Sequence, residues 1–129
     1  MNILLIDDDT RLLAEVERIL ARNGHTVTCA DNADDGAAMA ASNRYDFVLV
    51  DYRMPKHDGM WFLRNASISR RTKTLLVTSY VDRKVIQQMF NAGISGYVMK
   101  PFDESELLRH LEFHSNGHVN PQSVARKEV

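Results

Sequence analysis

Short apolar runs alternate with amphipathic stretches along the chain. The runs lie at residues 3–6, 26–29, 47–50, 75–77 and 96–99. Apart from the second, they are continuously apolar rather than alternating, which is typical of strands buried on both faces. The stretches between them carry apolar residues at helical spacing, as Leu13, Val16 and Leu20 do after the first run. The pattern predicts five strands, each followed by a helix.

Residues that favour helix ends lie at the expected boundaries. Gly24 follows the first helical stretch, Asn32 precedes the second and Asp58 precedes the third. Asp103 with Glu106 forms a capping box before the fifth. Strands buried on both faces need helices on both sides. The fold class is therefore α/β, a doubly wound five-stranded parallel sheet, (βα)5, in a three-layer sandwich.

The composition is that of one globular domain. The 129 residues are 44% hydrophobic and 26% charged, which excludes wholesale disorder. Because 16 Lys and Arg oppose 17 Asp and Glu, giving a net charge of −1, we expect no direct nucleic-acid or membrane binding. Cys29 is alone, which fits a reducing compartment, and we expect it in the core at a strand end.

The N-terminal apolar run is too short for a signal peptide or a membrane span, so we expect a cytoplasmic location. Residues 1–114 carry the alternating pattern and form the predicted domain. Residues 115–129 are polar and have no helical period, which is typical of a tail or the start of a linker.

Polar residues follow four of the predicted strands. They are Asp7, Asp8 and Asp9 after the first, Asp51 after the third, Thr78 at the end of the fourth and Lys100 after the fifth. Parallel strands place their carboxyl ends at one edge of the sheet, where ligands bind. Converging carboxylates repel by about 4 kcal/mol for a pair 4 Å apart at an effective dielectric constant near 20. The cluster therefore needs protons or a cation, and its hard oxygen donors favour Mg²⁺, with Mn²⁺ as the second choice.

The Thr78 hydroxyl and the Lys100 ammonium supply donors of the kind that the oxygens of a transferred phosphoryl group require. The alternative is that each acid is a solvated loop residue near a helix N-terminus, where aspartate is favoured. That interpretation suits Asp9, at the start of the first helix. It does not account for polar groups at successive strand ends with a lysine opposite them.

Four ordered motifs resemble the receiver domain of two-component response regulators. They are ILLIDDD, FVLVDYRMPKHDGM, LLVTSY and GYVMKPF, and the resemblance covers residues 1–114. It implies a flavodoxin-like fold with Asp51 as the phosphoacceptor. It also implies that Asp7 and Asp8 hold Mg²⁺ together with Asp51, and that the backbone carbonyl of Arg53 is a further metal ligand.

The same resemblance implies roles around the phosphoacceptor. Thr78 matches the switch hydroxyl, and Tyr97 matches the switch aromatic residue. Lys100 matches the lysine that pairs with the phosphate, and the family makes its bond to the following proline cis. The side chains of Arg53 and Tyr80 occupy the positions that border the phosphate.

Two aromatic side chains near the second motif stand out. His57 occupies a position where the family usually has methionine or another apolar residue before Asp-Gly. Trp61 follows a core position of the third helix, so we expect it to be partly exposed and consider it a candidate for a partner surface.

The mechanism implied by the resemblance is in-line attack of Asp51 on a phosphohistidine of a sensor histidine kinase or phosphotransfer protein. The domain then catalyses its own phosphorylation and slow dephosphorylation, and it is not a turnover enzyme. The face that responds runs from Val85 to Asn91, along the fifth strand, and from Leu107 to Leu111. A homodimer or an effector is its expected partner.

Two alternatives remain at this point. A Mg²⁺-dependent phosphohydrolase of haloacid-dehalogenase type also has a nucleophilic aspartate on a doubly wound sheet, but it needs a second acid where this chain has Arg53. A vestigial receiver could serve as an interaction module, although every required residue is present.

Overall fold

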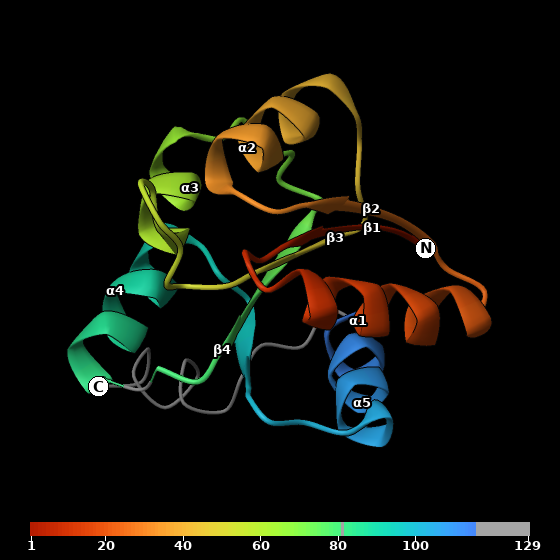
Figure 1. The fold of residues 1–129 in the computed structure, drawn as a ribbon. Helices are drawn as coiled ribbons and strands as arrows, with labels where there is room; N and C mark the ends of the chain where they lie inside the picture. Colours follow the sequence, from red (N-terminus) through yellow and green to blue (C-terminus); the bar gives the residue numbers. More distant parts are fainter. Residues whose placement is uncertain (81, 116–129) are drawn as a thin grey trace.

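The computed structural model describes residues 1–80 and 82–115, and it contains five parallel strands in one sheet (Figure 1). The strands are β1 (Asn2–Ile6), β2 (Thr26–Ala30), β3 (Phe47–Val50), β4 (Lys73–Thr78) and β5 (Gly96–Met99). The helices are α1 (Thr10–Arg22), α2 (Ala33–Ser42), α3 (Gly59–Asn65), α4 (Arg83–Ala92) and α5 (Glu104–Ser115). The predicted alternation of strands and helices is confirmed.

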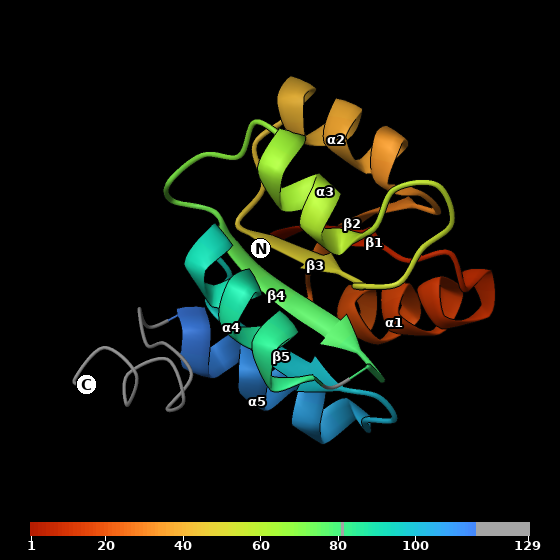
Figure 2. The ribbon, with the colours of Figure 1, turned by 90° about the vertical axis from the view of Figure 1, so that its left-hand side faces the viewer.

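Helices cover both faces of the sheet. α1 and α5 lie together on one face, and α2, α3 and α4 lie on the other (Figures 1 and 2). Because successive strand residues point to opposite faces, β1 contributes Leu4 and Ile6 to the core beneath α2, α3 and α4. Ile3 and Leu5 join the core beneath α1 and α5. This double burial explains the continuously apolar strands, and the predicted flavodoxin-like sandwich is confirmed.

The strand order β2-β1-β3-β4-β5 determines where a ligand site can form. The chain passes from β1 to β2 on one side and then crosses to β3 on the other, so the order reverses between β1 and β3. Asp7 follows β1, and Asp51 follows β3. The backbone N–H of Asp51 donates to the carbonyl of Ile6 at 2.9 Å, which keeps the two strand ends adjacent.

Acidic and amide side chains begin the helices by accepting hydrogen bonds from backbone N–H groups of the first turn. Asn32, Asp58 and Asp103 do so at the predicted boundaries. Asp9 caps α1 in the same way, which agrees with its expected place at the helix start. Asp82 caps α4, a boundary that the periodic pattern does not define.

Two expectations need correction. Cys29 is only half-buried, because β2 lies at the edge of the sheet and its neighbours cover it from one side. Ser115 belongs to α5 rather than to the predicted tail, and the rest of that tail lies outside the described residues. In the described part of the chain, no helix has the length and apolar character needed to cross a membrane.

Candidate functional site

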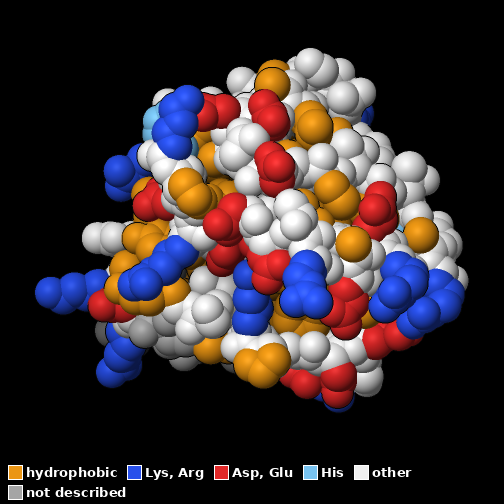
Figure 3. All heavy atoms as spheres, viewed as in Figure 1, with side chains coloured by type: hydrophobic (Ala, Val, Ile, Leu, Met, Phe, Trp, Pro, Cys, Tyr) orange, Lys and Arg blue, Asp and Glu red, His pale blue; other side chains and the backbone are white. Residues whose placement is uncertain are grey.

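Three carboxylates converge at the point where the strand order reverses. Asp7 and Asp51 are buried, with 5% and 7% of their surface exposed, whereas Asp8 is exposed. One oxygen from each lies within 4.8 Å of the others. The space-filling view shows acidic side chains gathered beside basic ones near the start of α1 (Figure 3). No other such group of His, Cys, Asp or Glu occurs among the described residues, so this is their candidate metal centre.

Lys100 lies against two of these acids. Its Nζ is 2.6 Å from Oδ2 of Asp7 and 3.5 Å from Oδ2 of Asp51. The peptide bond from Lys100 to Pro101 is cis, as the resemblance implies. Burial alone would lower the pKa of the Lys100 ammonium, but the bond to Asp7 and the charge of Asp51 outweigh it and raise the pKa above its usual value. Lys100 is therefore a cation at neutral pH.

The environment of Asp51 opposes its negative charge. Burial, and then the neighbouring charge of Asp7, raise the pKa of the Asp51 carboxyl. Lys100 and a hydrogen bond with the side chain of Thr78 lower it, but they do not cancel the first two effects. A carboxylate in this position gains from any further cation.

The donor set suits a hard divalent cation. All three acids offer carboxylate oxygens, the ligands that Mg²⁺ prefers, and no sulfur or imidazole group joins them. The single ammonium of Lys100 cannot balance three carboxylates. The residues present therefore fit Mg²⁺, with Asp7, Asp8 and Asp51 as the side chains that would hold it.

Arg53 and Tyr80, which were predicted to border the site, contact each other. The Arg53 guanidinium lies 3.8 Å above the centre of the Tyr80 ring. Tyr52, the residue directly after Asp51, also stacks on Tyr80, with ring centres 5.4 Å apart and planes 10° apart. Sequence reasoning missed Tyr52, because nothing in its spacing predicts a partner on another loop. The arrangement also leaves no acid at position 53 for a dehalogenase-type mechanism.

Thr78 and Tyr97 point to the same face of the sheet. Tyr97 pairs with Leu76 across the parallel ladder, and Thr78 is two residues further along β4, where side chains return to the same face. Thr78 is buried, whereas Tyr97 is half-buried and meets Phe90 of α4 edge-on, with ring centres 6.2 Å apart. The face of the sheet that carries Thr78 thus also carries an aromatic contact with α4.

A groove of about 760 Å³ adjoins the site between α1 and the segment that follows β5. Leu12, Arg18 and Arg22 line it from α1, and Lys100 and Phe102 line it from the other side. Apolar and charged side chains thus share a concave surface that ends at the lysine of the acidic site.

The sequence model of the response regulator receiver domain matches residues 3–112. The chain is 34% identical over 118 residues to the chemotaxis protein CheY of Pseudomonas aeruginosa, covering 87% of this chain and 94% of that protein. It spans about half the length, 46%, of other curated relatives that it matches.

Solved structures give the same relationship. A CheY-like response regulator receiver domain protein from Methanospirillum hungatei superimposes with a TM-score of 0.85 at 30% identity, covering 90% of this chain and 94% of that one. The receiver domain of sensor histidine kinase PA1611 from Pseudomonas aeruginosa superimposes with a TM-score of 0.79 at 28% identity, covering 89% and 97%. That structure holds a magnesium ion in its active site cleft. The chain belongs to the response regulator receiver domain family of two-component systems, whose members are phosphoacceptors rather than classical enzymes.

Proposed function

We propose that Asp51 is the phosphoacceptor of this receiver domain. The observation that carries the proposal is its position: a buried carboxylate where the strand order reverses, with Lys100 Nζ 3.5 Å away and two more acids within reach. Asp7, Asp8 and Asp51 hold Mg²⁺ in this proposal, together with the backbone carbonyl of Arg53. Mn²⁺ would serve in the same place, because it accepts the same oxygen ligands.

Phosphoryl transfer proceeds by in-line attack. A carboxylate oxygen of Asp51 forms a bond to phosphorus while the bond to the phosphohistidine nitrogen breaks, and the electron pair of that bond stays on the imidazole. Lys100 donates hydrogen bonds to the phosphoryl oxygens as charge develops on them. A metal ion held by Asp7, Asp8 and Asp51 would further neutralise that charge. The domain catalyses its own phosphorylation in this way.

Hydrolysis of the acyl phosphate returns the domain to its starting state. Water must reach the phosphorus beside Arg53 and Tyr80, whose side chains stack on each other. The domain thus catalyses its own dephosphorylation, with the stack as one control on the lifetime of the phosphoryl group.

Phosphorylation changes the hydrogen bonding of Thr78. A phosphoryl group on Asp51 is a charged acceptor for the Thr78 hydroxyl, and such a bond is worth about 1.5–3 kcal/mol, or roughly 10–150-fold in a two-state ratio. Inward movement of Thr78 leaves space for Tyr97 on the same face of the sheet. The responding surface runs from Val85 to Asn91, along β5, and from Leu107 to Leu111, and it meets an effector or a second copy of the chain.

The phosphodonor is a sensor histidine kinase or phosphotransfer protein, and the groove along α1 is its docking surface because it ends at Lys100. The receiver domain runs to the end of α5 at Ser115, and residues 116–129 are a tail or the start of a linker. The protein acts in the cytoplasm, where its kinase partner phosphorylates it.

The test is modification by a small phosphodonor. Wild type, Asp51→Asn and the control Asp46→Asn are incubated with acetyl phosphate in Mg²⁺, Mn²⁺ or EDTA, and the intact mass is measured. We expect one labile phosphoryl group on wild type and Asp46→Asn, only with a metal ion. Label retained by Asp51→Asn would reassign the acceptor, and absence of label from wild type would favour a vestigial receiver.

A further inference from the structure

The two ends of the loop that follows Asp51, at residues 52–58, lie against each other. The backbone N–H of Gly59 donates to the carbonyl of Tyr52 at 2.7 Å. A Cβ atom on Gly59 would lie 2.7 Å from the carbonyl oxygen of Asp51, so the two ends of the loop touch. Met54 is buried in the core and anchors the first half of the loop. The tip at Lys56 lies outside that core and needs another support.

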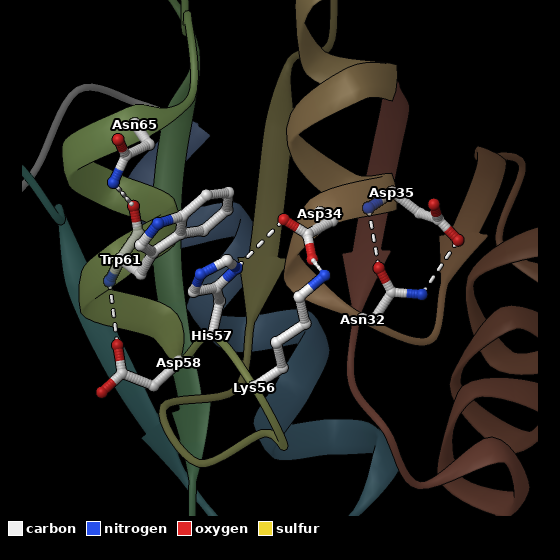
Figure 4. Close-up of polar contacts among 8 residues, drawn as sticks. All are labelled: Asn32, Asp34, Asp35, Lys56, His57, Asp58, Trp61 and Asn65. Atoms are coloured by element: carbon white, nitrogen blue, oxygen red, sulfur yellow. Dashed lines mark hydrogen bonds and ion pairs between the residues drawn. The ribbon is translucent and has the colours of Figure 1, made fainter.

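Asp34 in the first turn of α2 supplies this support. Its Oδ1 is 3.0 Å from Nδ1 of His57, and its Oδ2 is 3.1 Å from Nζ of Lys56. Figure 4 shows both loop side chains pointing at the one carboxylate across the space between the loop and α2. Lys56 has a φ of 71°, in the left-handed region, which is uncommon for a residue with a side chain. The residue that contacts α2 at the loop tip, Lys56, therefore also has a left-handed backbone conformation.

Trp61 holds the other side of the histidine ring. The two rings are stacked with centres 3.9 Å apart and planes 5° apart (Figure 4). The backbone N–H of Trp61 donates to Asp58, the cap of α3, at 2.9 Å. His57 is thus fixed between a carboxylate of α2 and an indole of α3, in place of the apolar residue usual in the family.

The charges around His57 favour this contact. Asp34 faces it from α2, Lys56 and Asp58 flank it in its own loop, and Trp61 faces it from α3. The hydrogen bond from Lys56, helped by that with His57, holds the pKa of the Asp34 carboxyl below its usual value. Asp34 is therefore ionised at neutral pH, and its two carboxylate oxygens contact the two loop side chains.

We propose that Asp34 is a positioning residue for the Asp51 site, and that its contact with His57 and Lys56 holds the loop after Asp51 in its binding geometry. The inference rests on the proposed function, because the loop carries the Arg53 carbonyl assigned there as a metal ligand. Surface ion pairs are weak, so loss of the contact weakens Mg²⁺ binding by about 1.5- to 5-fold.

The first measurement needs no metal. Trp61 is the only tryptophan in the chain, so its fluorescence reports directly on the stacked histidine. Because Asp34 holds the imidazole against the indole, we expect the emission of Asp34→Asn to differ from that of wild type, and that of Asp35→Asn to match wild type. His57→Phe retains an aromatic ring on Trp61 but offers Asp34 no hydrogen bond, so adding Asp34→Asn to it should leave its emission unchanged.

The second measurement is Mg²⁺ affinity by calorimetry at constant ionic strength. Asp34→Asn is compared with Asp35→Asn, which removes the same charge from the next residue of α2 but has no contact with the loop. We expect Asp34→Asn to bind Mg²⁺ about 1.5- to 5-fold more weakly than Asp35→Asn.

The outcomes separate the two proposals. Equal affinities for the two variants would overturn the positioning role of Asp34, whereas a wild type that binds no Mg²⁺ would overturn the metal site itself. Equal emission of wild type and Asp34→Asn would overturn the role of Asp34 in holding the stacked imidazole. Circular dichroism and the melting temperature of each variant establish that the comparison is between folded proteins.

Discussion

Replacing Lys100 by methionine tests how the site is held together without metal. The Lys100 ammonium is the cation that contacts both buried acids among the described residues, at 2.6 Å from Asp7 and 3.5 Å from Asp51. Methionine fills similar space and carries no charge. The Lys100→Met variant therefore leaves two carboxylates together in a buried position with no basic side chain against them.

The magnitude follows from burial. Removing one partner of a buried ion pair costs about 3–5 kcal/mol, since the remaining charge stays desolvated. The Lys100 side chain is 19% exposed, so we expect the lower end, about 3 kcal/mol. For a chain of this length that lowers the melting temperature by roughly 10 °C. Mg²⁺ should raise the free energy of unfolding of the variant more than that of wild type, because no ammonium competes with the ion for the carboxylates of the variant. Each tenfold gain in Mg²⁺ affinity adds about 1.4 kcal/mol to the free energy of unfolding.

The assay is urea unfolding of wild type, Lys100→Met and Lys84→Met, each in EDTA and in Mg²⁺. Lys84 is exposed at the start of α4 and makes a matched control for loss of a lysine charge. If Lys100→Met and Lys84→Met are equally stable in EDTA, or if Mg²⁺ stabilises both by the same amount, the reasoning about the buried pair is wrong.

Three further predictions concern other parts of the chain. Asp51→Asn should raise the melting temperature in EDTA by a few degrees and abolish the gain from Mg²⁺, because burial and Asp7 raise the pKa of Asp51 and oppose its charge. Gly59→Ala should lower the free energy of unfolding in urea by about 1–3 kcal/mol, because its Cβ would meet the Asp51 carbonyl. Burial, helped by Glu17, raises the pKa of the Cys29 thiol to about 11, two units above its ordinary value. Alkylation with iodoacetamide at pH 8 should therefore be about 100-fold slower in the native protein than in urea.

The sequence carries most of the information about the fold because β1, β3 and β4 are buried on both faces. Their continuous apolar runs mark them clearly, and parallel pairing then fixes where Asp7 and Asp51 must meet. Caps such as Asn32 and Asp58 were predictable for a similar reason, since each acts within its own first turn. The helix caps and the strand pattern can therefore both be predicted from the sequence alone.

Contacts between side chains on different elements were not predictable. Nothing in the spacing of Asp34 and His57 indicates that they meet, because their contact depends on how α2 and the loop after β3 are placed in space. The stack of Arg53 on Tyr80 depends in the same way on two loops. The half-burial of Cys29 followed from the edge position of β2, which strand order alone decides.

The closed loop between Asp51 and Gly59 also restricts how the chain can vary in length. Its ends touch, its middle is anchored by Met54 and its tip contacts α2, so an inserted or deleted residue would displace at least one of these points. In the connection between α3 and β4, Ala66 and Ile68 pack against the core and the Thr72 hydroxyl donates to the Tyr45 carbonyl, whereas residues 69–71 are exposed. Peptide tags or domain insertions should therefore be tolerated at residues 69–71 and excluded at residues 52–58, which makes the former the place to attach a reporter without disturbing the acidic site.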